Sequence, residues 1–351
     1  MRTVILAFLG LFTASALAQP SAPAAQPAAQ PSAPAAPPGY RLEAGPFKPA
    51  MKELKLGELP IRVRYPRGAT APVPLVIFSH GMGGSFDAFA EVTAHWVSHG
   101  YVVILPTHAD STRRQGRDGR AALLRDAEAY RRRVDPVARV NDVKLILRSL
   151  ENIELETPEL KLADGRPLID RERVGIAGHS AGALTTQMAI GAKVRTRDSL
   201  RPHSVGDDRF DAAIVISGQG TTNRMFTEDS WSTLDKPMLV ITGSKDTAGV
   251  GAETPESRRH PYEFAPAGDK FLLWIEGATH SSYQGPGRGA DIGRRLDREE
   301  PGTPLKVIGD AVMAQTLAFW DAYLKHDEAA AAYLREDRVR AVDEGVKPEH
   351  K

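Results

Sequence analysis

The residues best suited to chemistry in this 351-residue chain lie in the stretch Gly178–Gly182, which reads G-H-S-A-G. A short apolar run, 174–177, precedes it and predicts a buried strand, and the composition of residues 183–192 favours a helix. A serine at a sharp strand-to-helix turn between small residues presents its hydroxyl above the sheet, where the helix amino end stabilises negative charge. Ser180 is therefore a candidate nucleophile, although the pentapeptide alone is also typical of an ordinary glycine-rich connection.

Two further candidates each follow a later apolar run, in the chain order serine, aspartate, histidine. Asp246 comes shortly after the run 236–242, and His280 comes shortly after 270–275. An imidazole titrates near neutral pH and can take the serine proton, while a carboxylate fixes its tautomer and stabilises the imidazolium. The order serine, aspartate, histidine, each at the end of a strand, predicts a triad for nucleophilic attack on a carbonyl carbon.

Such an attack produces an oxyanion, which needs two fixed hydrogen-bond donors. We expect one to be the backbone N–H of Ala181, at the start of the helix after the nucleophile. The other should come from the loop S-H-G-M-G-G that follows Phe78, with Met82 as the candidate. The predicted oxyanion hole is therefore made of main-chain groups.

Other titratable residues fit these roles less well. Asp235, Asp269 and His260 precede strands and would lie at the opposite edge of a parallel sheet, while His108 is a further alternative base. His80 and His179 are more typical of residues that shape a loop. The chain has no cysteine, which excludes disulfides and a cysteine nucleophile, and its histidines lack metal-binding spacing. We expect neither a cofactor nor a metal.

The elements that must position these side chains alternate along the sequence. This alternation predicts an α/β fold with a mostly parallel central sheet, helices on both faces and a single domain. The charged stretch 108–140 is best interpreted as a solvated helix with flanking loops, because both signs of charge are interspersed. Strands are expected at 61–65, 75–78, 101–105, 174–177, 211–216, 236–242 and, as the last one, 270–275; helices are expected at 86–98, 140–153, 183–192 and 307–324.

The composition is that of a globular protein, with 42% hydrophobic residues, 25% charged residues and a net charge of +1. This charge gives no indication of a nucleic-acid partner or of a membrane surface. Residues 1–18 have the pattern of a signal peptide, so we expect export and no stable membrane insertion after cleavage. Residues 19–39 are expected to be a disordered Pro/Ala/Gln-rich linker, 40–334 the folded domain and 335–351 a charged tail.

Five stretches together resemble a known family over nearly all of residues 40–334: Val76–Gly84, Ser98–Val103, Gly178–Gly182, Ser230-Trp231 before Lys236-Pro237, and Gly277–Ser281. The chain is similar to the α/β-hydrolases and, among them, to the serine branch of the dienelactone-hydrolase-like group. That group includes chlorophyllase-like, platelet-activating-factor acetylhydrolase-like and polyester hydrolases. The resemblance implies an α/β-hydrolase fold and a Ser-His-Asp esterase without cofactor, with Ser180, Asp246 and His280 as the triad and Met82 and Ala181 as the oxyanion donors.

Three features separate the chain from parts of this group. Dienelactone hydrolases use a cysteine where Ser180 stands, and polyester hydrolases tend to have a tryptophan in the loop that here reads Ser217–Gly220, as well as a C-terminal disulfide. We therefore expect a secreted or periplasmic carboxylic ester hydrolase that forms an acyl-enzyme on Ser180, with a small-molecule, lipid or polymer ester as substrate. The alternatives are an amidase or peptidase with the same triad, a polyester-degrading hydrolase, and a non-catalytic binding module.

Overall fold

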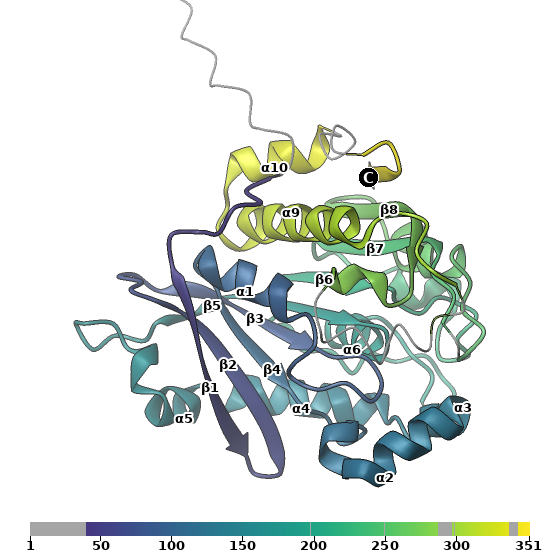
Figure 1. The fold of residues 1–351 in the computed structure, drawn as a ribbon, viewed down its shortest axis with the longest axis horizontal. Coiled ribbons are helices and arrows are strands. Elements are labelled where there is room, and N and C mark those ends of the chain that lie inside the picture. The colour runs from purple at the N-terminus through teal and green to yellow at the C-terminus, as the bar shows by residue number, and fades with distance from the viewer. Residues whose placement is uncertain (1–39, 197, 249, 287–296, 298, 337–342) are drawn as a thin grey trace, which may run out of the picture. The chain divides into compact units, whose positions relative to one another are not determined.

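The computed structural model describes residues 40–196, 198–248, 250–286, 297, 299–336 and 343–351. The predicted signal peptide and linker, residues 1–39, lie outside the described residues. Within the described ranges, nine strands form one sheet in the order β1-β2-β4-β3-β5-β6-β7-β8-β9 (Figure 1). From β4 to β8 in this order the strands run parallel to one another, β1 and β2 pair antiparallel, and β2 and β9 join β4 and β8 in antiparallel orientation. The expected fold class is confirmed.

The strands are β1 (Lys48–Leu56), β2 (Leu59–Arg67), β3 (Val73–Ser79), β4 (Val102–Pro106), β5 (Ile169–His179), β6 (Ala212–Ile216), β7 (Met238–Lys245), β8 (Lys270–Thr279) and β9 (Val346–His350). The α-helices are α1 (Ala90–Ser98), α2 (Thr112–Arg125), α3 (Ala127–Arg131), α4 (Pro136–Arg148), α5 (Leu150–Glu156), α6 (Ala181–Ala189), α7 (His260–Phe264), α9 (Leu305–Leu324) and α10 (Glu328–Arg335). Short 3₁₀ turns are η1 (Pro158–Leu160), η2 (Glu228–Trp231), η3 (Ser257–Arg259) and η4 (Ser282–Gln284).

The apolar runs located the six strands β3 to β8, the alternation Ile61, Val63, Tyr65 located β2, and both edge strands were missed. The expectation that 270–275 is the last strand is wrong, because β9 pairs antiparallel with β8 along its outer side. The sequence of β9, V-K-P-E-H, contains a proline and two charged residues, as is typical of edge strands, and therefore gives no continuous apolar signal. β1 is likewise largely exposed and rich in lysine.

Three expected helices have different bounds. The helix expected at 86–98 begins only at Ala90, because Phe89 adopts a left-handed backbone with φ 53°. The stretch expected as one helix over 140–153 contains two, α4 and α5, which meet at Ser149. The helix after the candidate nucleophile begins at Ala181 and ends at Ala189, so no residue separates Ser180 from it.

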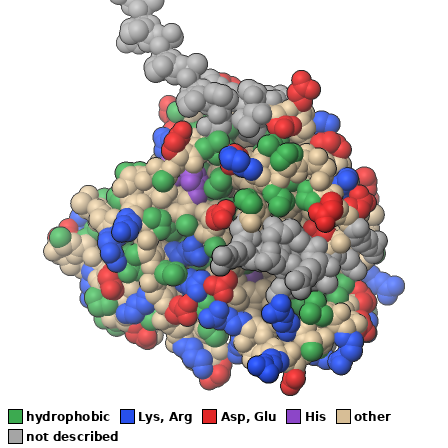
Figure 2. Space-filling view, viewed as in Figure 1, with side chains coloured by type: hydrophobic (Ala, Val, Ile, Leu, Met, Phe, Trp, Pro, Cys, Tyr) green, Lys and Arg blue, Asp and Glu red, His purple; other side chains and the backbone are tan. Residues whose placement is uncertain are grey.

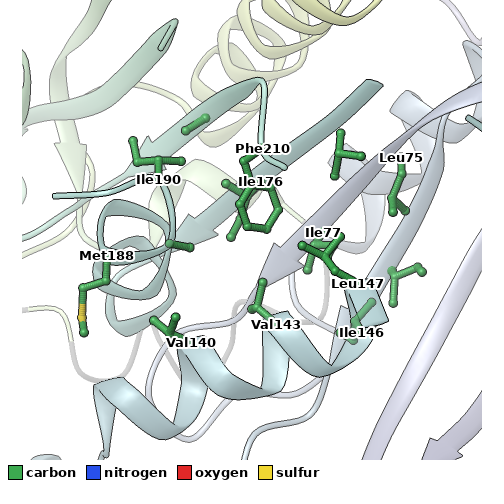
Figure 3. Packing of buried hydrophobic residues seen from close by; sticks show 14 of the residues in the cluster. Leu75, Ile77, Val140, Val143, Ile146, Leu147, Ile176, Met188, Ile190 and Phe210 are labelled. Atoms are coloured by element: carbon green, nitrogen blue, oxygen red, sulfur yellow. The ribbon is translucent and has the colours of Figure 1, made fainter. Parts of the chain in front are cut away.

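Each face of the sheet is covered by its own hydrophobic core. On one face, side chains of β3 and β5 pack against α4 and α6 (Figure 3). On the other face, α9 packs on the sheet, as the apolar stripe of the terminal helix predicts, and α1 packs beside it. Strands covered on both sides read as continuous apolar runs, which explains why the sequence located them. The first core includes Leu75, Ile77, Val143, Ile146 and Ile176, and the second includes Val76, Phe78, Trp96, Leu317 and Trp320.

The surface seen in Figure 2 carries lysine and arginine side chains interspersed with aspartate and glutamate. The residues of α2 and α3, which supply many of the basic side chains, are mostly exposed, as expected for a solvated stretch. The expectation of one solvated helix over 108–140 is otherwise wrong, because the stretch contains α2, α3 and the start of α4, and it buries His108, Asp110 and Arg139. Among the described residues, no helix combines the length and the apolar composition needed to cross a bilayer.

Candidate active site

Ser180 lies at the junction of β5 and α6 with a backbone that only glycine adopts easily, φ 56° and ψ −117°. The small neighbours permit this sharp turn. A Cβ atom on Gly178 would lie 2.2 Å from the carbonyl oxygen of Gly182, and one on Gly182 would lie 1.9 Å from that of Ser79. Both glycines are therefore required by close backbone approach, and the strand leads directly into the helix whose amino end faces the serine.

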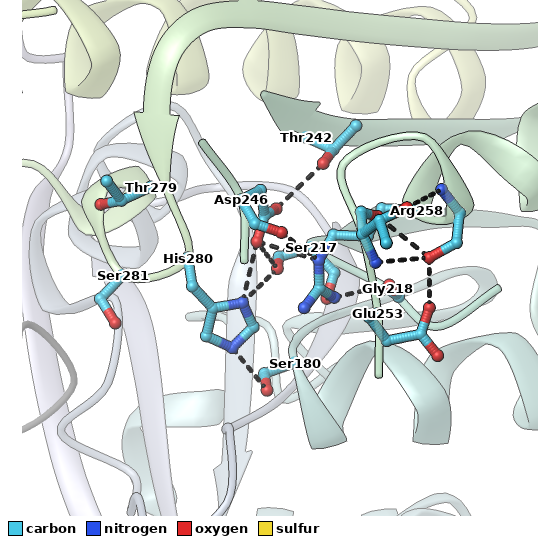
Figure 4. Close-up of polar contacts among 12 residues, drawn as sticks. Ser180, Ser217, Gly218, Thr242, Asp246, Glu253, Arg258, Thr279, His280 and Ser281 are labelled. Atoms are coloured by element: carbon cyan, nitrogen blue, oxygen red, sulfur yellow. Dashed lines mark hydrogen bonds and ion pairs between the residues drawn. The ribbon is translucent and has the colours of Figure 1, made fainter. Parts of the chain in front are cut away.

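The structure brings the three predicted side chains together at the carboxyl ends of three parallel strands (Figure 4). Ser180 follows β5, Asp246 follows β7 and His280 follows β8. Nε2 of His280 lies 2.9 Å from Oγ of Ser180, and Nδ1 lies 2.9 Å from Oδ1 of Asp246. A carboxylate can only accept, so Nδ1 carries the proton and Nε2 is free to accept the serine hydroxyl. This arrangement can remove a proton from Ser180 as it attacks a carbonyl.

Asp246 is completely buried and is surrounded by donors. Oδ1 accepts from Ser217 Oγ at 2.8 Å as well as from His280, and it lies 3.0 Å from Nε of Arg258. Oδ2 accepts from Thr242 Oγ1 at 2.9 Å and from Tyr283 Oη at 2.8 Å. Both lone-pair regions of the carboxylate are thus occupied, which fixes its orientation toward the histidine.

Arg258 and Ser217 are the main site residues that the sequence did not reveal. The Arg258 guanidinium is 1% exposed and also donates to the carbonyl oxygens of Asp246, Ser217 and Gly218. Ser217 has φ 51°, and its Oγ lies 2.6 Å from Nδ1 of His280. Ser217 directly follows the apolar run of β6, a position that could have marked it, but Arg258 lies in a short 3₁₀ turn without any motif.

Charges around the site determine which groups are ionised. Burial raises the pKa of Asp246, but the Arg258 charge and the hydrogen bonds from His280 and Ser217 prevail and hold it below its ordinary value. Burial, together with the neighbouring His280, lowers the pKa of His179 to about 3. His179 is therefore neutral at physiological pH and donates from Nε2 to the carbonyl oxygen of His280 at 2.7 Å. It holds the backbone of the loop at His280, in keeping with the loop-shaping role expected for it.

The loop after β3 lies beside Ser180. A Cβ atom on Gly81 would be 3.5 Å from Cβ of Ser180. Within the part of the chain that the structure describes, the backbone N–H groups of Met82 and Ala181 donate to no protein acceptor. Two uncommitted N–H groups next to a serine at a helix amino end are the arrangement expected for an oxyanion hole. Their role stays a prediction.

The alternative acids and bases considered from the sequence do not belong to the hydrogen-bonded chain of Ser180. Asp269 and Asp235 precede their strands, and His260 accepts from the Thr221 N–H at 3.2 Å. His108 does have a hydroxyl and a carboxylate as partners, Ser79 Oγ at 2.9 Å and Asp142 at 2.8 Å.

Ser79 and His108 are 0% exposed, however, so this second Ser-His-Asp chain is closed to a substrate. No group of three His, Asp or Glu residues among those described is placed to hold a metal ion.

Comparison with known proteins agrees with this geometry. Residues 58–245, more than half of the chain, match the family model described as platelet-activating factor acetylhydrolase, isoform II. The platelet-activating factor acetylhydrolase of Canis lupus familiaris is 25% identical over 235 residues, which cover 60% of this chain and 48% of that protein. The one of Cavia porcellus is 20% identical over 308 residues, 77% of this chain and 62% of that protein.

The chain thus spans about half to three-fifths of the length of these curated relatives. The matched region runs from β2 to the end of β7 and includes the elbow at Ser180. The sheet, the strand-to-helix turn and the family match point the same way: the chain has an α/β-hydrolase fold and belongs to the family of platelet-activating factor acetylhydrolase, isoform II.

Proposed function

We propose that the protein is a serine carboxylic ester hydrolase with Ser180 as nucleophile and His280 as general base. Asp246 is the carboxylate of the triad, which orients His280. The observation that carries the proposal is the continuous hydrogen-bonded chain from Ser180 Oγ through His280 to a buried carboxylate. Ser180 Oγ attacks the ester carbonyl and transfers its proton to Nε2, which then protonates the departing alcohol. Water, deprotonated by His280, releases the acid from the acyl-enzyme.

The negative charge that develops on the carbonyl oxygen would be met by the N–H groups of Met82 and Ala181. Main-chain donors fixed before the reaction need no reorganisation, and loss of one typically costs about a hundred- to a thousand-fold in turnover. Asp246 would hold the His280 ring and stabilise the imidazolium. No step of this mechanism requires a cofactor.

The substrate we propose is an acetyl or other short acyl ester of a phospholipid, as the names of the family and of the relatives suggest. We also propose that the chain is exported and that residues 1–18 are removed on export, on the basis of their signal-peptide pattern. The loops 218–231 and 281–301 would shape the substrate site; residues 287–296 and 298 of the second loop lie outside the described residues.

The test is ester turnover by the wild type and by Ser180→Ala, with platelet-activating factor and with p-nitrophenyl acetate and butyrate. We expect the substitution to reduce turnover by at least about 10⁴-fold, because removal of the nucleophile leaves only binding and the oxyanion donors. A fluorophosphonate probe should label the wild type at Ser180 and leave the variant unlabelled. Equal rates for the two proteins would refute the proposal, and faster cleavage of matched amides would favour an amidase or peptidase.

A further inference from the structure

A buried ion pair lies behind the loop that carries Met82, and the mechanism proposed above does not use it. Arg139 in α4 and Asp110 after β4 have side chains that are 2% and 4% exposed. Nε and Nη2 of the guanidinium bond Oδ1 and Oδ2 of the carboxylate at 2.9 and 2.7 Å, a bidentate arrangement. Burying both charges carries a large desolvation penalty, so stability alone is a poor explanation for the pair.

The pair acts on the peptide unit that ends in the Met82 N–H. The carbonyl oxygen of Gly81 accepts from Nδ1 of His80 at 2.6 Å, from the N–H of Gly84 at 3.1 Å and from Nη2 of Arg139 at 3.3 Å. A peptide unit is planar and trans, so its C=O and N–H point in opposite directions. Donors that fix the Gly81 carbonyl therefore also fix the direction of the Met82 N–H, and they polarise it into a stronger donor.

The residue on the other side of Met82 is held by the same pair. Oδ2 of Asp110 accepts from the N–H of Gly83 at 3.2 Å, and the Gly83 carbonyl accepts from the N–H and Oγ1 of Thr112 at 3.0 and 2.9 Å. Gly83 has φ 72°, and a Cβ there would lie 2.8 Å from Leu123. Met82 is thus flanked on both sides by backbone that is anchored to the Arg139–Asp110 pair.

The helix that supplies Arg139 is itself fixed on the sheet. Val140, Val143, Ile146 and Leu147 of α4 are buried in the core formed with β3 and β5 (Figure 3). Arg139 Nη1 also donates to the carbonyl oxygen of His80 at 2.7 Å. Through Arg139 and α4, the loop that carries Met82 is therefore fixed on the same sheet that carries Ser180.

We infer that Arg139, paired with Asp110, is a positioning residue that fixes the Gly81–Met82 peptide unit so that the Met82 N–H faces the oxyanion formed on Ser180. This inference rests on the proposed function, because an oxyanion arises only if Ser180 attacks a carbonyl. The pair touches no substrate and acts through the loop, so its loss should affect the transition state more than substrate binding.

The experiment compares ester turnover with the affinity for a trifluoromethyl ketone. Ser180 Oγ adds to the ketone carbon, the C=O double bond becomes a C–O⁻ single bond, and the serine proton passes to His280. The adduct therefore places an oxyanion in the hole without a leaving group. The variants are Arg139→Lys, which keeps the charge, and the double variant Arg139→Met/Asp110→Asn, which leaves no buried ion without its partner.

The matched control is Arg171→Met. Arg171 lies near the amino end of β5, far along the strand from Ser180, and pairs at 2.6 Å with Glu154, which is 6% exposed. This variant disrupts another arginine–carboxylate pair and leaves Glu154 without this partner, a perturbation of stability at least as severe as in the Arg139 variants. No hydrogen bond given for the described residues connects the pair with the loop that carries Met82. We expect a lower unfolding temperature with unchanged kcat and unchanged ketone affinity.

For both Arg139 variants we expect kcat to fall about 10- to 100-fold and the ketone inhibition constant to rise by a similar factor, while KM changes less than about threefold. In the wild type, ketone binding should move the amide proton resonance of Met82 downfield, a readout that needs no variant. Folded variants with wild-type kcat and ketone affinity, or an unmoved Met82 resonance in the adduct, would overturn the inference. Absence of Ser180-dependent turnover in the wild type would instead refute the proposed function.

Discussion

At the scale of single residues, the feature with most consequences is the number of donors around Asp246. Five side chains from four regions of the chain converge on its two oxygens: Ser217, Thr242, Arg258, His280 and Tyr283. A carboxylate held in this way needs no rearrangement when the histidine becomes charged, so the site is organised before a substrate arrives.

Substitution of Ser217 by alanine tests this organisation. The change removes a hydroxyl that donates to Asp246 and lies 2.6 Å from Nδ1 of His280. A hydrogen bond to a charged group contributes about 1.5–3 kcal/mol, so we expect kcat to fall about 10- to 100-fold with little change in KM. Steady-state kinetics with p-nitrophenyl butyrate measure both constants.

Ser217→Gly is the matched control for backbone strain. It also removes the hydroxyl, but glycine accepts the φ of 51° without penalty. The two variants should share the same loss of kcat, whereas the glycine variant should be about 1 kcal/mol more stable in urea than the alanine variant. Wild-type kcat in both would show that the hydroxyl does not support the triad.

The sequence predicted the residues that follow strand ends better than those that support them. Ser180, Asp246 and His280 each follow a buried apolar strand, so their positions could be inferred from pattern and order. Arg258 could not be found in this way, because its partners are carbonyl oxygens and a carboxylate that only the folded chain brings together. The identity of a residue as arginine does not reveal whether its side chain is buried.

At the scale of elements, the turn between β5 and α6 depends on Gly182. A Cβ at this position would lie 1.9 Å from the carbonyl oxygen of Ser79, the residue from which the loop to Met82 begins. For Gly182→Ala we expect a loss of about 1–3 kcal/mol in the free energy of unfolding, together with a lower kcat, because the loop must shift. Urea titration and ester turnover measure the two effects.

Gly165→Ala is the control that separates the effect of a steric collision, expected at Gly182, from the effect of backbone strain. Gly165 has φ 85°, and apart from its two chain neighbours no described residue has an atom within 4 Å of the position that a Cβ would take, so alanine there is strained without a collision. We expect a cost of about 1 kcal/mol and unchanged kcat. Equal effects of the two substitutions on turnover would contradict the proposed link between Gly182 and the loop.

The contribution of the edge strand β9 to stability can be tested at Val346. Val346 is completely buried where β9 pairs with β8. Val346→Ala removes two methyl groups from this core and should cost about 2 kcal/mol in urea unfolding, while kcat at room temperature stays unchanged. A variant as stable as the wild type would show that the C-terminal segment contributes little to the sheet.

Sequence patterns did not predict the edge strands or the break between α4 and α5. The central strands β3, β4 and β6 are buried at every position and consist mostly of apolar residues, whereas β1 and β9 each have exposed positions that break the run. The break between α4 and α5 at Ser149 is not marked by proline or glycine, so residues 140–153 looked continuous. Long buried elements are predictable from sequence, and the edges depend on tertiary contacts.

At the scale of the whole molecule, buried carboxylates determine the response to acid. Burial raises the pKa of Asp246 and of Asp110, but Arg258 and Arg139 respectively outweigh it and hold both values below the ordinary range. A carboxyl with a depressed folded-state pKa contributes stability above its unfolded pKa, near 3.9, and this is lost as the pH falls through the folded value. We expect the free energy of unfolding to decrease steeply below about pH 4 in urea titrations.

Arg258→Met is the variant that checks the origin of this acid dependence. Without the guanidinium, burial acts on Asp246 with less opposition, and protonation then relieves a buried charge. The destabilisation by this substitution should therefore be largest near pH 7 and shrink toward pH 3. A difference between the two proteins that is independent of pH would assign the acid sensitivity to other groups.

Three donors hold the Gly81 carbonyl oxygen, so the oxyanion role proposed for position 82 depends on its main-chain N–H, and the side chain of Met82 is free to vary. A library randomised at Met82 should accordingly yield many active members that differ in the acyl chains they prefer, with proline, which lacks the N–H, as the consistent exception. Natural substitutions at position 82 could alter the preferred acyl chain while the main-chain N–H is kept.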